Sequence, residues 1–351
     1  MKDIELTERE KLVLKCIVQN FVLTANPVGS RVISKKYQLG LSSASIRNVM
    51  SDLEDLGLIY HPHTSAGRIP TDLGYRLYVD LLMEEPKLLP QIKRKIEKEI
   101  SLEKTKNEEE LLKLTSQILG KITHKLALVT YPQIMKAVLE KINLVVLPHN
   151  MLLVVMSLRG GIIKTIDLEF QIKVSQDKIY DVQNLLNERI AGLSLEEIRN
   201  TFADRFADLK DEKTGVVRFF IESLDKIFSE TRELEKFHIS GIKNILQEPE
   251  FLDSEHMQAV IELIEDKEII LHIFNRTRDI TDNKILVSIG KENDYDKLSE
   301  FSVVTTKYKF GDADGVIGMI GPIRMDYSKV IAIVAYMSNL LTDILRNRIK
   351  S

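Results

Sequence analysis

The residues with the most informative chemistry lie between residues 42 and 68, where short polar and cationic side chains follow one another. Residues 42–51 read SSASIRNVMS, and residues 61–70 read HPHTSAGRIP. Serine, asparagine and arginine side chains bond both base edges and phosphates, so this composition is typical of a nucleic-acid contact. The candidate contact residues are Ser42, Ser43, Ser45, Arg47, Asn48, Ser51, His63, Thr64 and Arg68, with Arg31, Lys35 and Lys36 upstream of them.

Acidic residues are absent from the same part of the chain. No Asp or Glu occurs from residue 11 to residue 51, or again from residue 56 to residue 71. The cations of the first stretch are Lys11, Lys15, Arg31, Lys35, Lys36 and Arg47. The formal charge of the whole chain is −3, so the prediction of a polyanionic partner rests on this local segregation. A plain surface helix and hairpin would explain a serine cap but not the missing acids.

The elements that must position these residues are three helices and a hairpin. Thr7 and Glu10 have capping-box spacing, and apolar residues at helical intervals predict a helix that ends near Asn26. We expect a second, short helix capped by Ser30, with Val32, Ile33 and Tyr37 inward. The third helix starts at Ser42 or Ser43, stops at Gly57 and has its buried face formed by Ile46, Val49, Met50, Leu53 and Leu56.

A short turn between two such helices is the spacing of a DNA-binding helix-turn-helix. Short strands at residues 58–60 and 68–69 around a Pro- and Gly-containing tip predict a wing. A fourth helix follows from Thr71 and Asp72, and Pro86 favours a domain end near Glu85.

Composition places the chain among soluble globular proteins of two or three domains, because 351 residues exceed one usual core and 44% are hydrophobic. Cys16 stands alone in an apolar helix, which excludes an intrachain disulfide and favours a buried thiol. No apolar run reaches the roughly 18 residues of a membrane span, and the first residues do not resemble a secretory signal. We therefore expect a cytoplasmic protein without a membrane partner.

Beyond residue 85 the pattern predicts an α+β domain that carries an insertion. A charged helical connector with a thin apolar stripe occupies residues 86–120. Strand patterns at residues 126–130, 142–147, 151–158 and 162–168 predict one antiparallel meander, followed by a helix capped by Ser175. A mainly helical block comes next, with a second capping box at Ser194 and Glu197 and further helices marked by Val216, Phe220 and Met257. Strand patterns return at residues 268–274, 285–289, 301–308 and 316–320, before a last helix capped by Asp326.

No constellation of residues predicts catalysis, a metal or a cofactor. His61 and His63 flank Pro62 without a third ligand, so we interpret them as polar loop residues. Gly315, Gly318 and Gly321 lack the Lys-Ser/Thr of a phosphate loop and fit a strand better. Arg324 and Asp326 could hold an anion, but a helix cap and an ion pair are the favoured interpretation. We do not expect an enzyme.

Three strings carry a resemblance to a known family. Residues 27–59 (PVGSRVISKKYQLGLSSASIRNVMSDLEDLGLI), residues 63–71 (HTSAGRIPT) and residues 321–327 (GPIRMDY) together resemble the HrcA family of heat-shock transcription repressors. The resemblance implies an N-terminal winged helix, a GAF-like domain and a dimerising domain inserted into it. With the patterns described above, the expected boundaries are 1–85 for the winged helix-turn-helix, 86–120 for the connector, 121–191 and 281–351 for the GAF-like domain, and 192–280 for the insertion.

The resemblance also implies partners. The family represses chaperone operons by binding an inverted-repeat operator called CIRCE, and the GroEL chaperonin maintains the repressor in its active form. One winged helix reads only a few base pairs, which favours a homodimer on double-stranded DNA. The alternative is a repressor gated by a small molecule, with the GAF-like domain as the sensor.

The site residues then take separate roles. We expect Arg47 and Asn48 to reach base edges, and Ser43 and Ser45 to contact bases or nearby phosphates. The upstream cations on the second helix would neutralise phosphates. Arg68 would enter the minor groove or grip its backbone, unless it pairs with Asp52 or Asp55 in the same domain.

Overall fold

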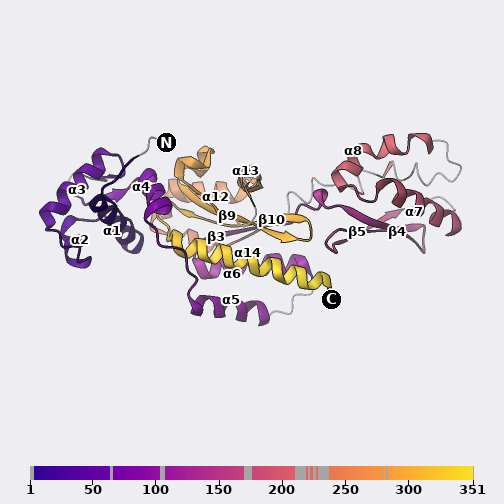
Figure 1. Cartoon of the computed structure of the whole chain (residues 1–351), viewed down its shortest axis with the longest axis horizontal. Helices are drawn as coiled ribbons and strands as arrows, with labels where there is room; N and C mark the ends of the chain where they lie inside the picture. Colours follow the sequence, from indigo (N-terminus) through magenta and orange to yellow (C-terminus); the bar gives the residue numbers. More distant parts are fainter. Residues whose placement is uncertain are drawn as a thin grey trace. The chain divides into compact units, whose positions relative to one another are not determined.

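The chain is a mixed α+β protein in the computed structural model of Figure 1. The structure describes residues 4–63, 66–102, 107–169, 176–209, 219, 222–223, 227, 237–278, 280–281 and 284–350. Contacts divide the chain into two compact units. Unit 1 comprises residues 1–128, 238–306 and 317–337, and unit 2 comprises residues 129–237, 307–316 and 338–351.

The N-terminal segment of unit 1 consists of three helices, α1 (Glu8–Thr24), α2 (Ser30–Lys36) and α3 (Ser43–Asp55). The capping box of Thr7 and Glu10 is confirmed at the start of α1, and Ala25 ends the helix in the left-handed conformation. The fully buried side chains Leu14, Ile17, Ile33, Ile46 and Leu53 form the core between the helices. Apolar residues at helical spacing therefore fix the inner face of each helix.

Three details of α2 and α3 differ from expectation. Gly29, and not Ser30, is the N-cap of α2, because the hydroxyl of Ser30 is bonded to α3 instead. Val32 was expected to point inward, but 43% of its surface is exposed. Leu56, expected on the buried face of α3, is 40% exposed because it lies just beyond the last turn.

The predicted hairpin is present as β1 (Ile59–Tyr60) and β2 (Ile69–Pro70), which pair antiparallel. Its second strand is also tied to the residue before α2, since Val28 and Arg68 exchange two backbone hydrogen bonds of 2.8 and 2.9 Å. Gly67 permits this approach, because a Cβ there would lie 2.6 Å from the Val28 carbonyl carbon. Thr71 caps α4 (Asp72–Leu77), which continues as a π-helical turn, Tyr78–Leu82.

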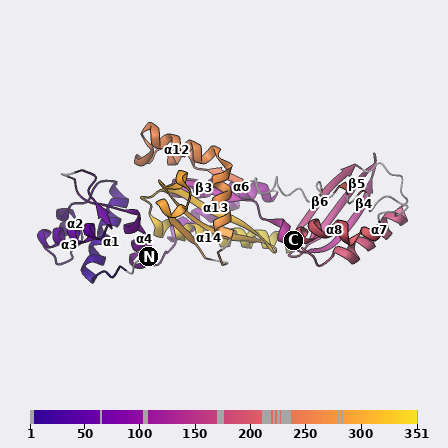
Figure 2. The same cartoon turned by 90° about the horizontal axis from the view of Figure 1, so that it is seen from above.

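A five-stranded sheet with the order β7-β3-β10-β9-β8 forms the centre of the C-terminal part. Its strands are β3 (Leu126–Thr130), β7 (Phe237–Ser240), β8 (Leu286–Ile289), β9 (Phe301–Phe310) and β10 (Ala313–Pro322). The helices α6 (Glu108–Thr123) and α14 (Tyr327–Lys350) lie on one face, and α13 (Lys267–Arg278) lies on the other (Figures 1 and 2). Hydroxyl pairs join both layers to β9, Ser302 to Tyr327 at 2.6 Å and Thr305 to Thr277 at 2.7 Å.

Further helices of unit 1 complete this part of the chain. They are α5 (Pro90–Leu102), α11 (Ile242–Ile245) and α12 (Ser254–Glu265), with 3-10 turns at Pro249–Phe251, Gly290–Asn293 and Asp296–Leu298. By length and composition, α14 passes as a bilayer-spanning helix among the described residues. Its side chains Val330, Ile333, Val334, Met337 and Leu341 are nevertheless buried in the protein, so core packing accounts for its apolar character.

Unit 2 is built on a three-stranded antiparallel meander of β4 (Leu139–Leu147), β5 (Met151–Leu158) and β6 (Ile163–Glu169). The helices α7 (Gln176–Ile190) and α8 (Leu195–Arg205) share one apolar core with it, and short 3-10 turns lie at Ile134–Lys136 and Ala207–Leu209. The amide of Asn187 on α7 bonds both the N–H and the C=O of Ile142 on β4, each at 2.8 Å. The capping box of Ser194 and Glu197 is confirmed.

Three expectations for this part of the chain were wrong. Residues 268–274 are not a strand but lie in α13, because the buried residues Ile269, Ile270, Ile273 and Phe274 follow a helical interval. The strand at residues 126–130 belongs to the five-stranded sheet and not to the meander. The apolar stripe of α6 is not thin, since six of its apolar residues are buried, namely Leu111, Leu112, Leu114, Ile118, Leu119 and Ile122. Ser175, Val216 and Phe220 lie outside the described residues.

The division between the units also differs from the expected one. The insertion was placed at residues 192–280, whereas the long middle segment of unit 2 covers residues 129–237 and includes the meander. Helices α12 and α13, expected within the insertion, belong to unit 1. Capping boxes and helical stripes identify elements but not the sheet with which a helix packs, so the sequence pattern placed the boundary too late.

The structural interpretation of the C-terminal motifs is confirmed. Gly315 and Gly318 lie in β10, where a Cβ would meet the Tyr308 ring at 2.2 Å and the Thr305 methyl group at 2.4 Å. Arg324 pairs with Glu248 at 2.9 Å and also with Glu250. A carboxylate oxygen of Asp326 accepts a hydrogen bond from the Lys329 N–H at 3.2 Å, as expected of a helix cap.

Candidate nucleic-acid interface

The outward face of α3 carries the polar residues that the sequence singled out. Ser45, Arg47, Asn48 and Ser51 are exposed, whereas Ile46, Met50 and Leu53 on the opposite face are buried. Gly57 follows the helix with φ +72°, the left-handed conformation predicted for its end. A helix whose first turns present serine, arginine and asparagine outward has the side chains needed to bond bases and phosphates.

Two serines at the start of α3 have a structural task. The Ser42 hydroxyl accepts a hydrogen bond from the Ser45 N–H at 3.1 Å, which makes Ser42 the N-cap. The Ser43 hydroxyl lies 3.0 Å from that of Ser30, the first residue of α2. Ser43 is therefore half-buried, and it fixes the first turn of α3 against the first turn of α2.

The helix before α3 presents three cations beside this face. Arg31, Lys35 and Lys36 on α2 are all exposed, as expected. The Lys36 ammonium lies 5.5 Å from the centre of the Tyr37 ring, a cation–π distance. Within the described part of the chain, Arg31, Lys35 and Arg47 form no ion pair. Their charge is available to an anionic partner, because no neighbouring carboxylate neutralises it.

The acids of α3 lie at its far end. Asp52, Glu54 and Asp55 occupy the last turn, and no acid occurs in the first turn. The helix is thus divided along its length, with uncharged and cationic groups near the N-terminus and carboxylates near the C-terminus. An approaching phosphate backbone meets favourable charge only at the N-terminal half, the half with which recognition helices contact base edges.

Arg68 was expected to contact DNA from the hairpin, but its side chain is not exposed for such a contact. Its side chain is only 17% exposed, and its Nη2 lies 2.8 Å from Oε2 of Glu54. The Arg68 Nε is buried without a hydrogen-bond partner among the described residues. The guanidinium therefore points at α3 rather than outward, and a direct groove contact does not fit this geometry. Its partner is neither Asp52 nor Asp55, both of which are exposed to solvent.

The sequence interpretation missed the role of Glu54. The carboxylate forms an ion pair with Arg68 and also lies 2.6 Å from Nδ1 of His61, which was expected to be a plain loop residue. A signal was present, because Glu54 follows the buried Met50 by four residues and so lies toward the inner side of α3. At the hairpin tip His63 is exposed as expected, and Thr64 lies outside the described residues.

The one cysteine is not part of this surface. Cys16 lies in α1 and is only 4% exposed. Burial raises the pKa of its thiol to about 11, although Lys15 acts in the opposite direction. A buried thiol held in its neutral form agrees with the structural role predicted for Cys16.

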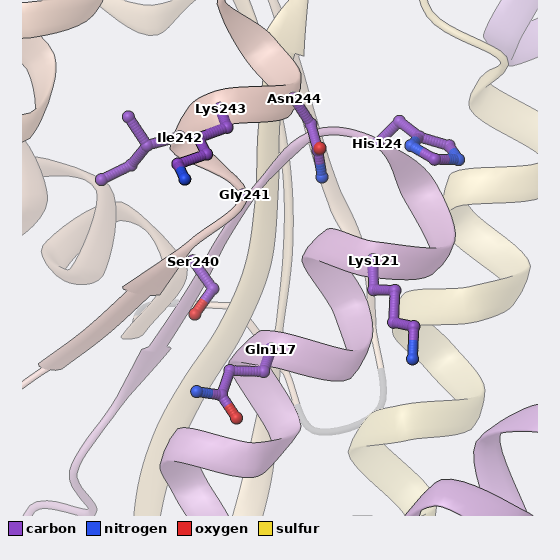
Figure 3. Close-up of a pocket in the computed structure, with 8 residues that line it drawn as sticks. All are labelled: Gln117, Lys121, His124, Ser240, Gly241, Ile242, Lys243 and Asn244. Carbon is purple, nitrogen blue, oxygen red and sulfur yellow. The ribbon is translucent and has the colours of Figure 1, made fainter.

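A cavity of about 500 Å³ lies elsewhere in unit 1, between α6 and the turn that follows β7 (Figure 3). Its lining residues include Gln117 and Lys121 of α6, His124 directly after this helix, and Ser240 and Asn244. Several of these groups are already engaged within the protein. Lys121 pairs with Glu99 at 2.6 Å, the Ser240 hydroxyl lies 2.9 Å from that of Ser116, and the Asn244 amide donates to the Gly120 carbonyl at 2.9 Å.

Comparisons with known proteins agree on one family. The family model described as the HrcA protein C-terminal domain matches residues 109–331. A heat-inducible transcription repressor HrcA of Chlorobium phaeobacteroides (strain BS1) is 39% identical over 345 residues, which cover 96% of this chain and 98% of the relative. The protein of the same description from Prosthecochloris aestuarii is 40% identical over 349 residues, which cover 97% and 98%.

One solved structure has the same fold over nearly the whole length. The crystal structure of a hypothetical protein matches with a TM-score of 0.59 and 24% sequence identity, covering 98% of this chain and 99% of that one. At this identity the likeness concerns the fold alone. A protein of known structure therefore shares the mixed α+β fold.

Proposed function

Because the chain belongs to the HrcA family of heat-inducible transcription repressors, we propose that it binds an inverted-repeat operator of the CIRCE type as a homodimer and thereby represses chaperone operons. A transcription repressor acts by binding DNA, and we assign it no catalytic activity. Its place of action is the bacterial cytoplasm, where the DNA is.

The DNA-binding part is the segment from α1 to β2, which we interpret as a winged helix-turn-helix with α3 as the recognition helix. The observation that carries this assignment is the outward position of Arg47 and Asn48, on the half of α3 that lacks acids. We assign base contacts to these two residues and neighbouring contacts to Ser45 and Ser51.

Phosphate contacts follow from the same arrangement. The exposed cations Arg31, Lys35 and Lys36 flank α3 and have the charge to neutralise the DNA backbone. The tip of the hairpin, with His63 and Thr64, is the part of the wing that we assign to the adjacent groove. Ser42 and Ser43 orient the recognition helix through the cap and the bond to α2.

A homodimer follows from the size of one DNA-binding segment. One recognition helix reads only a few base pairs, and a palindromic site matches two-fold protein symmetry. We propose the outer face of the β4-β5-β6 sheet as the surface through which two copies associate. Val145 is 44% exposed and Ile163 66% exposed on this face, the half-buried Leu153 and Val155 lie between them, and exposed apolar side chains in one region mark association sites.

The five-stranded sheet with α6, α13 and α14 is, in our proposal, the GAF-like domain of the family. We further propose that the GroEL chaperonin maintains the repressor in its active form and that heat-damaged proteins compete for the chaperonin. The operon is then transcribed during heat stress, because less chaperonin is free to maintain the repressor in its active form. Family membership is the ground for the feedback, and its test is a binding assay with and without chaperonin.

The cavity of Figure 3 favours a second candidate, a repressor gated by a small molecule. Its lining includes Lys243, and also Lys121, which already pairs with Glu99 at 2.6 Å. No acid among the described residues lines the cavity, so the ligand would be anionic. Thermal-shift screening against small anionic metabolites separates the two candidates. A ligand that raises the melting temperature and changes operator affinity without chaperonin favours the second.

The deciding experiment is footprinting of the purified full-length chain on the promoter of its own chaperone operon, with chaperonin added or omitted. We expect two protected half-sites about 10 base pairs or a multiple of that distance apart, and stronger protection when chaperonin is present. Protection that covers no inverted repeat contradicts the operator assignment. Equal protection in both arms contradicts the chaperonin dependence.

A further inference from the structure

We infer that Glu54 is a positioning residue for DNA recognition, because its single carboxylate fastens both strands of the hairpin to the recognition helix. The inference rests on the proposed function and deepens it. It assigns to Arg68, through Glu54, the task of fixing the wing instead of touching DNA.

The geometry is that of a clamp. Oε1 of Glu54 lies 2.6 Å from Nδ1 of His61, the residue directly after β1. Oε2 lies 2.8 Å from Nη2 of Arg68, the residue directly before β2. The two contacts therefore hold both strands of the hairpin at the ends that lie next to its tip. Glu54 itself lies in the last turn of α3, so any rotation of the hairpin relative to α3 must break at least one of them.

The clamp extends to the other helix that faces DNA. The backbone of Arg68 exchanges two hydrogen bonds with Val28, one residue before Gly29, the N-cap of α2. The Nε of Arg68 is buried without a hydrogen-bond partner among the described residues, and Glu54 is the acid that pairs with this guanidinium, through Nη2. Arg68 is thus held to α3 through Glu54 and to the residue before α2 through its own backbone, and these two helices carry the proposed base and phosphate contacts.

The positioning role and simple electrostatics predict opposite changes in operator affinity when the Glu54 charge is removed. Removing a carboxylate from a DNA-binding segment raises its positive charge and should tighten binding to any DNA. If Glu54 positions the wing, the same change instead weakens binding to the operator. The reason is that the wing and α3 are then no longer held in the relative position in which both contact the DNA. The ratio of operator affinity to affinity for scrambled DNA therefore separates the two effects.

The test compares Glu54→Gln with Asp55→Asn in the full-length protein. Asp55 is exposed on the same turn, so its change removes an equal charge without touching the hairpin. We expect Glu54→Gln to lower the ratio of operator to scrambled-DNA affinity by about tenfold, the lower end for a charge-assisted hydrogen bond. We expect Asp55→Asn to leave the ratio unchanged. An unchanged ratio in Glu54→Gln overturns the inference.

A second measurement works without DNA. Hydrogen exchange of the Val28 and Arg68 amides, which pair with each other, should quicken by about tenfold in Glu54→Gln and not in Asp55→Asn. Unchanged exchange overturns the clamp. A wild-type chain that does not prefer the operator overturns the proposed function, and the exchange measurement then still decides whether Glu54 holds the hairpin.

Discussion

The exposed face of α3 and the outer face of the β4-β5-β6 sheet are both the outward side of an amphipathic element, but the sheet face exposes large apolar side chains among its polar ones. On α3 the outward residues include Arg47, Asn48 and Ser51, which water solvates well. On the sheet, Val145 lies beside Leu153 in register, and Val155 lies on the same face. The first surface is stable alone and gains from a polyanion, whereas the second gains free energy when a second apolar surface covers it.

The largest effect of a substitution is expected at the sheet. Val145→Asp places a charge in the proposed interface, and we expect the dimer dissociation constant to rise by roughly 100-fold or more, because an uncompensated buried charge costs about 3 to 5 kcal/mol. Sedimentation velocity at micromolar concentration should then show monomer. Operator binding should fall with it, since one DNA-binding segment reads only half of the site.

Val146, the residue after Val145, provides a matched control. Val146 is 48% exposed, compared with 44% for Val145, but it pairs with Leu152 and so belongs to the other face of the sheet. Val146→Asp should leave the protein dimeric. If both variants dissociate, the effect comes from the fold of the sheet and not from its outer face.

The next largest effect is expected on α3. Arg47→Ala should cost about 1 to 3 kcal/mol of operator binding and relax the sequence preference, because a base contact is lost. Titrations on operator and single-base variants measure both quantities. Arg9, an exposed arginine in the first turn of α1, provides the control, and Arg9→Ala should change neither. Unchanged operator affinity in Arg47→Ala refutes the assignment of Arg47 as a base contact.

The sequence predicted the first region better than the second. Capping residues, helical spacing and glycine stops are local, and they located α1, α3 and the hairpin to within a few residues. The partner of Arg68 was only partly predictable, because helical spacing from the buried Met50 favours Glu54, but Asp52 and Asp55 lie at nearly the same distance along the chain. Choosing among them requires the rotation of α3 against the hairpin, which is a tertiary property.

Nonlocal pairing also explains the errors in the C-terminal part. The strand at residues 126–130 has the same β-branched and leucine-rich composition as the meander strands, but it pairs within a sheet whose other strands lie more than 100 residues later. Residues 268–274 contain four buried apolar residues in a short run, which suits either a strand or a helix. Local composition does not distinguish these cases, because the packing partner decides them.

A smaller effect distinguishes phosphate contacts from base contacts on the same surface. Lys36→Ala should weaken operator and scrambled DNA alike and make the dependence on salt shallower by about one unit of slope. Titrations at several salt concentrations give this slope. Lys98, which is exposed on α5, is a matched lysine outside the proposed surface, and its replacement should leave the slope unchanged. A selective loss of operator binding in Lys36→Ala would instead indicate a base contact.

The last prediction is that the reactivity of Cys16 does not change in these variants, and this control makes the other results interpretable. Burial raises the pKa of Cys16 to about 11, so the thiolate that reacts with alkylating reagents is scarce at pH 8 in the folded protein and abundant only as the pH approaches that value. Labelling with iodoacetamide should therefore be slow at pH 8 in the native chain and fast in denaturant. Arg47→Ala, Lys36→Ala and Val145→Asp should all keep the slow rate, because none of these residues belongs to the core of α1. A variant with fast labelling has lost the packing of the N-terminal helices, and its weaker DNA binding then reports unfolding and not a missing contact.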